Sequence, residues 1–502
     1  VLSWPVVERQ PAGLTDYFPQ RGYAVAIVDL RGTGRSQGCL DHLGPTDARD
    51  AKEVVEWAAR QPWSSGRVGV TGFSYPAMAS VLALSTRPQG LVTAVPVAAI
   101  ASMYEHQFQA GVPYAFQWAG PMVSYPLGGT VRHLPPNPVS ELTAWPWGDN
   151  FGNDPQYAAC GWMASSLTTG EAQLSGQSVE WHAQRDFRAP ATAARIPVFL
   201  VHGLYDKATR SVASRWFFER EPGLGDKVWL GPWGHSSPRA AQLTEAIHAW
   251  FDHHLMQRTW VGDGGARHPI DTGPPVEVFL SDAETLEAAQ LPDQRDAVAV
   301  AGAWPRPDVT LALHPHSGGA LALDEEATEG SVAFTGDSRD SATGIVKPDY
   351  NEDTEATGNA TFVSAPFEED TLLLGQPELK LSASVTAPRV HVIATAYDES
   401  PSGARRRITT FAMNPELRNG IDQIAPVIPG QRMELRPPGS PVAHDLRAGH
   451  RIVLRVTTSQ QDKVGVFSVD PRVTVFTGRD ATMLRLPTVA SALLIEDTVP
   501  LQ

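Results

Sequence analysis

The chain has 502 residues, of which 42% are hydrophobic and 19% are charged, the balance of a soluble globular protein. Its formal net charge of −15 argues against a nucleic-acid-binding surface, and no apolar run approaches the roughly 18 residues of a membrane-spanning helix. The length predicts about two to four domains. Because the chain starts at Val1 without a charged-then-apolar leader, we expect a processed or truncated N-terminus.

The first part of the sequence alternates between expected strands and helices. Tyr23–Asp29 is a nearly continuous apolar run, as in a strand that is covered on both faces of a parallel sheet. Thr46 is a suitable N-cap for a helix. Further strands are expected at Val68–Val70, Leu91–Ile100, Ile196–His202 and Lys227–Leu230, with helices from Pro76 and over Leu243–Met256. This order predicts a doubly wound α/β sheet.

Residues 101–190 interrupt the alternation. Tryptophan, tyrosine, proline and glycine accumulate there. A long insertion between sheet strands is typically a lid or cap over a site, although the aromatic residues could equally serve only as the core of that small cap. We therefore expect a cap insertion within a catalytic domain that spans residues 1–257.

Residues 258–502 have a different composition. Turns rich in Gly, Pro and Asp separate short alternating segments, without a helical period. The expected strands are Val276–Leu280, Val309–Leu313, Leu379–Val385, Val390–Ala396, Ile452–Thr457 and Val473–Thr477. This pattern predicts an all-β domain, a β-sandwich of the jelly-roll type.

A single serine lies between the strand at Val68–Val70 and the helix from Pro76. Ser74 has Gly72 two residues before it, which is the layout of a nucleophile elbow, a tight turn that exposes a serine oxygen. Pro76 replaces the usual second glycine, and the first turn of a helix tolerates proline. The pentapeptide alone fits a catalytic elbow and a plain Gly-Ser turn equally well.

Two later positions favour the catalytic interpretation. Ser74, Asp206 and His235 each follow an expected strand of one sheet, and the carboxyl ends of such strands line a common crevice. Their chain order is that of an α/β-hydrolase triad. His235 would take the proton of Ser74, Asp206 would orient the imidazole, and the backbone N–H of Tyr75 would bind the oxyanion.

The surrounding segments resemble the serine hydrolase group that contains Xaa-Pro dipeptidyl-peptidases, cocaine esterases and related acyl esterases. The segments that carry the resemblance are Gln61-Pro62-Trp63 through Ser74-Tyr75, Val201-His202-Gly203-Leu204 and Ala448-Gly449-His450-Arg451. The resemblance extends over nearly the whole chain. It implies an α/β-hydrolase domain with a cap, followed by a C-terminal β domain.

The sequence departs from the peptidase pattern near the expected nucleophile and acid. Pro76 stands where peptidase members often carry Asp, and Lys207-Ala208-Thr209 also differs from their pattern. The family usually supplies a second oxyanion donor from a tyrosine, but Val1–Pro5 offers none at the corresponding place. We therefore leave the second donor unassigned.

The resemblance implies a serine hydrolase that cleaves an amide or ester bond through an acyl-enzyme, without a metal or cofactor. The leading substrate is a short peptide with proline second from a free N-terminus. An acyl esterase or amino-acid ester hydrolase acting on a small molecule is the alternative. We expect neither a nucleic-acid nor a membrane partner, and the sequence leaves open whether the chain forms a homo-oligomer.

A peptidase of this kind needs a carboxylate for the substrate ammonium, because an unpaired buried charge is costly. The cap candidates are Glu105, Asp149, Asp154 and Asp186, among which the sequence does not choose. A catalytically inert protein whose β domain binds a polymer is the alternative of another class. The complete Ser, Asp and His set argues against it.

The two cysteines, Cys39 and Cys160, cannot complete a tetrahedral zinc site by themselves. They are either free thiols or one disulfide. Cys39 lies in a segment that resembles the family and Cys160 lies in the expected cap. A disulfide between them would imply an oxidising, extracellular location.

Overall fold

The computed structural model describes residues 14–31, 36, 41, 43–114, 176–235, 240–258, 275–280, 297–301, 310–323, 329–336, 358–460 and 470–489. The chain divides into two compact units. The first unit contains Val1–Met103, Gln117–Phe199 and Arg239–Asp271. The second contains Tyr104–Phe116, Leu200–Pro238 and Thr272–Gln502.

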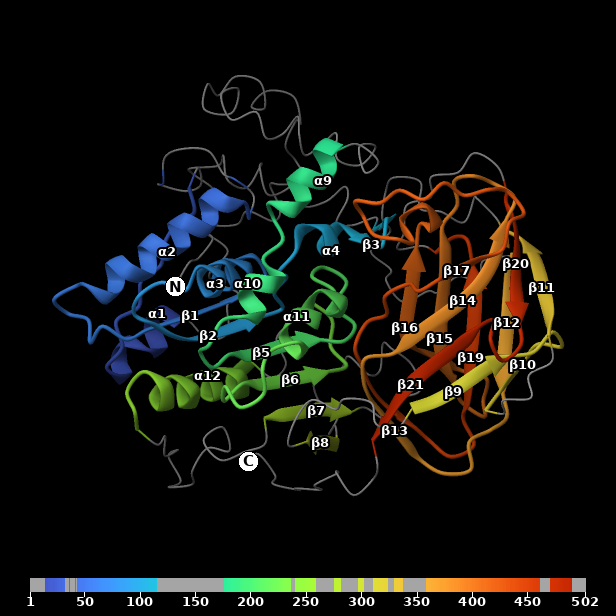
Figure 1. The fold of residues 1–502 in the computed structure, drawn as a ribbon. Coiled ribbons are helices and arrows are strands. Elements are labelled where there is room, and N and C mark those ends of the chain that lie inside the picture. Colours follow the sequence, from blue (N-terminus) through green and yellow to red (C-terminus); the bar gives the residue numbers. More distant parts are fainter. Residues whose placement is uncertain are drawn as a thin grey trace, which may run out of the picture. The chain divides into compact units, whose positions relative to one another are not determined.

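The first unit is built on two parallel strands, β1 (Val68–Phe73) and β2 (Leu91–Val97). Val198 continues this pairing with a parallel bridge to Ala94. Its helices are α1 (Leu14–Tyr17), α2 (Pro45–Ala59), α3 (Tyr75–Thr86), α9 (Gly176–Ala183), α10 (Arg188–Thr192) and α12 (Ala240–His254). Helices α2, α3 and α10 lie on one side of the two strands and α12 on the other (Figure 1). The strands are therefore covered on both faces, as predicted for a doubly wound sheet.

The sequences of α2 and α3 reflect their positions. Helix α3 is apolar on all sides and is buried from Tyr75 to Leu84, whereas α2 buries one stripe that includes Ala51 and Val55. Helix α12 packs close to β1, since a Cβ at Gly69 would lie 2.8 Å from the ring of Phe251. A glycine is required there.

Two local predictions in the first unit are wrong. Tyr23–Asp29 is not a regular strand: only Val28 makes a β-bridge, and Ile27 is 40% exposed. An apolar run becomes a regular strand only where a neighbouring strand forms hydrogen bonds along it, and the composition of the run does not reveal whether this happens. Thr46 is not a helix cap, because Pro45 occupies the first helical position and Gly44 is the N-cap.

The second unit continues the α/β pattern with four neighbouring strands. These are β5 (Phe199–Gly203, from Leu200 on in this unit), β6 (Lys227–Gly231), β7 (Val276–Leu280) and β8 (Ala297–Ala301). Strand β7 pairs parallel with β6, and β8 pairs antiparallel with β7. Val276–Leu280 is thus a strand, as predicted, but it extends the α/β pattern instead of joining the strands of the β-rich region.

Thirteen strands of the described residues form the β-rich region of the second unit. They are β9 (Thr310–Pro315), β10 (Ala320–Ala322), β11 (Gly330–Thr335), β12 (Asn359–Ser364), β13 (Thr371–Gly375), β14 (Glu378–Val385), β15 (Val392–Glu399), β16 (Arg405–Met413), β17 (Met433–Leu435), β18 (Val442–Leu446), β19 (Arg451–Thr457), β20 (Arg472–Thr477) and β21 (Met483–Val489). The main order is β11-β20-β14-β21-β9-β10-β12-β19-β15-β16.

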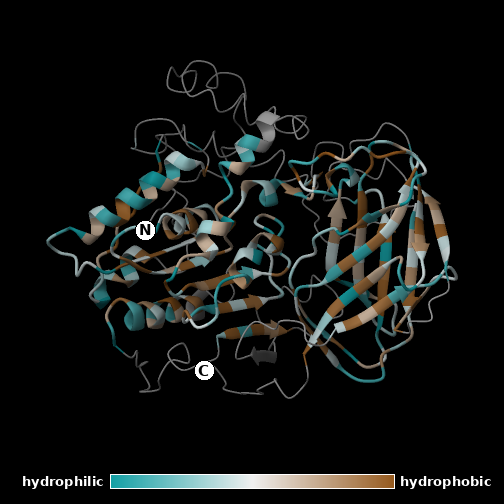
Figure 2. Ribbon diagram, in the orientation of Figure 1, coloured by the Kyte–Doolittle hydropathy of each residue, from teal (hydrophilic) through white to brown (hydrophobic). Residues whose placement is uncertain are grey.

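Alternating burial explains how these strands form a core. Strands β12 and β18 alternate between buried and partly exposed residues. Figure 2 shows hydrophobic and hydrophilic colours interspersed along the strands of this region. Phe362, Phe411 and Leu454 are among the fully buried residues of this core. An all-β C-terminal region is therefore confirmed, whereas its jelly-roll type and the boundary at residues 257 and 258 stay predictions.

The segment at the start of the expected cap belongs to the second unit. It contains α4 (Met103–Gln107) and the short pair β3 (Phe108–Gln109) and β4 (Val112–Pro113). The Gln109 amide donates 2.7 Å hydrogen bonds to the carbonyl oxygens of Thr410 and Pro438, which fasten this segment to the β-rich region. Most of the expected cap, residues 115–175, lies outside the described residues. No helix in the described part is both long and apolar enough to span a membrane.

Candidate active site

Ser74 lies in the turn between β1 and α3. Its φ of 61° and ψ of −124° lie in a region that residues other than glycine rarely adopt, and such strain tends to accumulate at functional sites. The turn is held by the Ser74 N–H, which donates to the carbonyl oxygen of Val97 at 3.0 Å. A Cβ at Gly72 would lie 2.5 Å from Pro76, so only glycine fits two residues before the serine. This is the geometry of a nucleophile elbow.

Asp206 follows β5 in the second unit, and its carboxylate is fully buried. Oδ1 accepts hydrogen bonds from the N–H groups of Ala208 and Thr209 at 2.7 and 2.9 Å. Oδ2 accepts from the Thr209 hydroxyl at 2.6 Å and faces Nδ1 of His235 at 2.9 Å. Burial alone would raise the pKa of Asp206, but the charge and hydrogen bond of His235, together with the Thr209 hydroxyl, hold it well below its usual range.

His235 follows β6, and its side chain is 29% exposed. The two turns that carry Asp206 and His235 are joined by backbone hydrogen bonds: the N–H of Leu204 donates to Gly231 and that of Tyr205 donates to Trp233. Gly203 has no room for a side chain, because a Cβ would lie 2.3 Å from the carbonyl oxygen of Trp233. The close approach of these turns brings the predicted acid and base together.

The structure adds two residues that sequence reasoning missed, His202 and Thr209. Nε2 of His202 lies 3.4 Å from the Thr209 hydroxyl and 3.8 Å from Oδ2 of Asp206. His202 is fully buried, and this burial lowers its pKa to about 4, so it is neutral near pH 7. In the sequence, His202 is marked only by its place near the end of β5, four residues before Asp206.

Among the other predicted residues, Tyr75 is the first residue of α3, where the partial positive charge of the helix N-terminus lies. Asp186 forms a bidentate ion pair with Arg188, with Nε and Nη2 at 2.8 and 2.5 Å. Glu105 lies in the first turn of α4. Asp149, Asp154, Cys39 and Cys160 lie outside the described residues. The disulfide and the choice among the four cap carboxylates stay predictions.

A polar cluster in the first unit is centred on Arg185. Its guanidinium donates to Oδ1 and to the carbonyl oxygen of Asp41 at 2.7 and 2.9 Å, and it lies 4.1 Å from the centroid of the Trp181 ring. Asp47 is almost completely buried nearby, and burial raises its pKa to about 7. These contacts join the end of the expected cap to the segment before α2. No group of three or more His, Cys, Asp or Glu side chains in the described residues could hold a metal ion.

Two family models match the sequence. Residues 6–237 match the family model of the X-Pro dipeptidyl-peptidases (S15 family), and residues 269–493 match their C-terminal non-catalytic domain. The chain belongs to this family. A Streptomyces avermitilis protein with the provisional name of Xaa-Pro dipeptidyl-peptidase is 26% identical to it over 556 residues, which cover 97% of this chain and 74% of that protein.

Solved structures show the same fold at low sequence identity. An aminopeptidase from a marine sediment Thaumarchaeota archaeon has a TM-score of 0.72 and 16% identity, over 96% of this chain and 90% of that one. An α-amino acid ester hydrolase has a TM-score of 0.69 and 17% identity, over 94% and 87%. The predicted α/β-hydrolase fold and the prediction of a serine hydrolase, peptidase or esterase, are confirmed.

Proposed function

We propose that this member of the S15 family is an Xaa-Pro dipeptidyl-peptidase in which Ser74, His235 and Asp206 form the catalytic triad. The observation that carries the proposal is the hydrogen bond between Nδ1 of His235 and the buried Asp206 carboxylate. It orients Nε2, on the opposite edge of the ring, for proton transfer. The strained elbow at Ser74 supports the assignment of the nucleophile.

The reaction follows from the chemistry of these groups. Ser74 Oγ attacks the scissile carbonyl carbon while Nε2 of His235 takes the hydroxyl proton, and the backbone N–H of Tyr75 binds the oxyanion. The C–N bond then breaks, and His235 returns the proton to the leaving amine. Water attacks the acyl-enzyme by the same route and releases the acid. Asp206 stays ionised and stabilises the imidazolium.

The substrate assignment rests on the family and on the relatives' names. A free substrate N-terminus requires a carboxylate, and Glu105, Asp149 and Asp154 remain candidates, whereas the pairing of Asp186 with Arg188 weakens its case. The alternative is an acyl or amino-acid ester hydrolase. Pro76 and Lys207-Ala208-Thr209, where the chain departs from the peptidase pattern, favour this alternative.

Three substrates distinguish the two activities: an Ala-Pro anilide, its N-acetylated form and a simple aryl ester. A dipeptidyl-peptidase will turn over the free-amine anilide at least about tenfold faster than the acetylated one, because a buried carboxylate loses its ionic partner on acetylation. Equal rates for the two anilides, together with faster ester turnover, would establish the ester hydrolase instead.

We also propose an extracellular location, with a disulfide between Cys39 and Cys160, for an enzyme without nucleic-acid partners. The segment around Cys39, which resembles the family, supports the disulfide, and a disulfide in turn supports an extracellular location. Mass measurement of the native, unreduced protein tests it, since two free thiols would contradict the disulfide. We further propose that the β domain has a jelly-roll topology and that the chain forms a homo-oligomer. Sedimentation of the purified protein tests the oligomer.

A further inference from the structure

The turn that carries Asp206 contains a chain of three side chains that ends on its carboxylate. His202, Thr209 and Asp206 are all buried. Nε2 of His202 lies 3.4 Å from Thr209 Oγ1, and the Thr209 hydroxyl donates to Asp206 Oδ2 at 2.6 Å. Oδ2 is the same oxygen that faces Nδ1 of His235. Two donors therefore converge on one carboxylate oxygen from different sides.

The direction of each hydrogen bond follows from the number of protons. An ionised carboxylate only accepts, so the single hydroxyl proton of Thr209 must point at Asp206. The lone pairs of Thr209 then face His202, and Nε2 of that ring must carry the proton. His202 is therefore the Nε2–H tautomer, a neutral donor.

This arrangement differs from a plain buried histidine. Nδ1 of His202 has no hydrogen-bond partner among the described residues and is fully buried. An unsatisfied buried nitrogen is unfavourable, so packing alone does not explain a histidine at this position. What the ring supplies is a donor on the Thr209 side. That donor holds the hydroxyl oxygen so that the O–H of Thr209 keeps pointing at Asp206.

We propose that Thr209 and His202 are positioning residues that hold Oδ2 of Asp206 in the orientation that accepts the Nδ1–H of His235. The proposal rests on the proposed function, because it assumes that Asp206 orients the base. Thr209 also limits how much negative charge Asp206 presents to the imidazole, since Oδ2 shares its charge between two donors. Both effects act on catalysis through His235 and not on the substrate.

Thr209→Val is the direct test, because valine has nearly the same shape and lacks the hydroxyl. With one donor fewer, Asp206 attracts the His235 proton more strongly, so the imidazole becomes protonated at a higher pH. We expect the acid limb of the kcat/KM–pH profile to move upward by about half to one pH unit, and plateau kcat to fall about tenfold with little change in KM. The assay uses the Ala-Pro anilide and the aryl ester.

Three variants serve as controls. Thr209→Ser keeps the hydroxyl and is expected to stay within about twofold of wild type in kcat. His202→Gln keeps an amide donor near the position of Nε2, whereas His202→Leu removes it. We expect the leucine variant to shift the acid limb in the same direction as Thr209→Val, and the glutamine variant to shift it less. Thermal unfolding verifies that each variant is folded.

The outcomes separate this inference from the proposed function. If wild type turns over neither substrate, the proposed function and this inference both fail. If wild type is active and Thr209→Val is folded with the wild-type profile, only the inference fails, and Thr209 and His202 have a structural role alone. A shifted limb in Thr209→Val and His202→Leu, with restoration in Thr209→Ser, supports the inference.

Discussion

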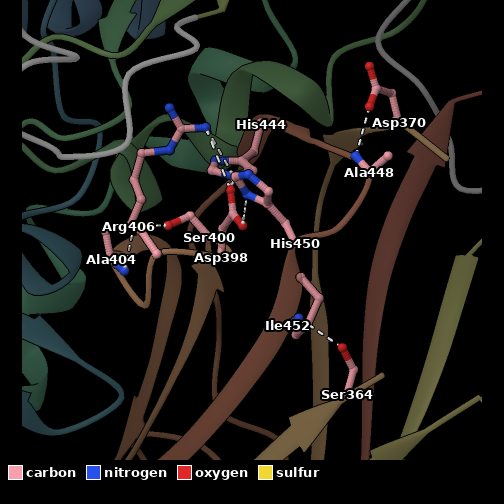
Figure 3. A network of polar contacts seen from close by, with 11 residues as sticks. Ser364, Asp370, Asp398, Ser400, Ala404, Arg406, His444, Ala448, His450 and Ile452 are labelled. Carbon is pink, nitrogen blue, oxygen red and sulfur yellow. Dashed lines mark hydrogen bonds and ion pairs between the residues drawn. The ribbon is translucent and has the colours of Figure 1, made fainter. Parts of the chain in front are cut away.

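The second unit contains two clusters in which one aspartate lies close to two histidines. At the first cluster, Asp206 faces His235 and His202. At the second, Asp398 of β15 faces Nε2 of His444 at 2.9 Å and Nδ1 of His450 at 2.7 Å (Figure 3). Burial by itself would raise the pKa of each aspartate, but the hydrogen bonds with the neighbouring histidines hold both pKa values below their usual range. The residue types are the same, yet only the first cluster is part of the triad that we propose.

The difference lies in what surrounds each carboxylate. Asp206 is held by two backbone N–H groups of its own turn and by Thr209, so one partly exposed imidazole is left to change its protonation. Asp398 is bound by both imidazoles, and Nη2 of Arg406 lies 3.9 Å from it and 3.2 Å from Nε2 of His444. These side chains come from β15, β16, β18 and the residue that precedes β19, so the second cluster ties strands together. A His–Asp pair alone does not indicate catalysis.

Replacement of each aspartate gives the largest contrast. Asp206→Asn leaves the His235 imidazole without a carboxylate to fix its tautomer, and kcat should fall about 10⁴-fold. Asp398→Asn should leave kcat within about twofold, because its histidines do not take part in the reaction. Steady-state kinetics on the best substrate measures both. Comparable losses of kcat in two folded variants would remove the distinction between the clusters.

The second cluster should instead show its effect in stability. Asp398→Asn removes the buried carboxylate that accepts from His444 and His450 and lies 3.9 Å from Arg406, which should lower the free energy of unfolding by about 3 kcal/mol. Asp370 is a matched control: it pairs with Arg447, and its side chain is 54% exposed. Asp370→Asn should change stability by less than about 0.5 kcal/mol. Urea unfolding compares the two, and equal losses would contradict a structural role for Asp398.

The pH dependence of unfolding reports on the fully buried histidine of each cluster. Burial lowers the pKa of His202 and of His444 to about 4, so between pH 4 and 6.5 the unfolded chain binds more protons at these sites than the folded one. Stability from these two groups is therefore present above about pH 6.5 and is lost as the pH falls toward 4. Asp47, with its pKa raised to about 7 by burial, acts in the opposite direction over the same range.

Asp47→Asn tests this balance. The substitution removes the opposing group, so the rise in unfolding free energy between pH 4 and 6.5 should become steeper by up to about 1.4 kcal/mol per pH unit. Urea unfolding at about pH 4.5, 5.5 and 6.5 measures this slope. An unchanged slope would mean that Asp47 is ionised in the folded protein.

The smallest expected effect concerns a link between the neighbourhoods of the two clusters. Tyr205, next to Asp206, donates its hydroxyl proton to the carbonyl oxygen of Arg407 in β16 at 3.2 Å. Tyr205→Phe should cost about 1 kcal/mol of stability, the usual net value of one such hydrogen bond. A kcat within about threefold of wild type is expected, since the hydrogen bonds of the Asp206 carboxylate are made by other residues. A loss of kcat above a hundredfold would show that this link positions the acid.

The sequence predicted those parts of the fold and site that depend on local patterns. Gly72 and Ser74 mark the elbow because a tight strand-to-helix turn admits few residue types. Tyr23–Asp29 was misjudged because an apolar run does not reveal whether a neighbour is available, and Val276–Leu280 was correct as a strand but not in its pairing. His202 was missed because its role depends on Thr209, and that contact exists only once the turn has folded.

Labelling with a fluorophosphonate probe tests the central claim most directly, because the probe reacts with a serine only where a base activates it. We predict one label per chain, located on Ser74 by mass spectrometry, absent in Ser74→Ala and strongly slowed in His235→Ala. Asp398→Asn should label at the wild-type rate. A folded protein that takes no label at Ser74, or that labels equally well without His235, would contradict the account.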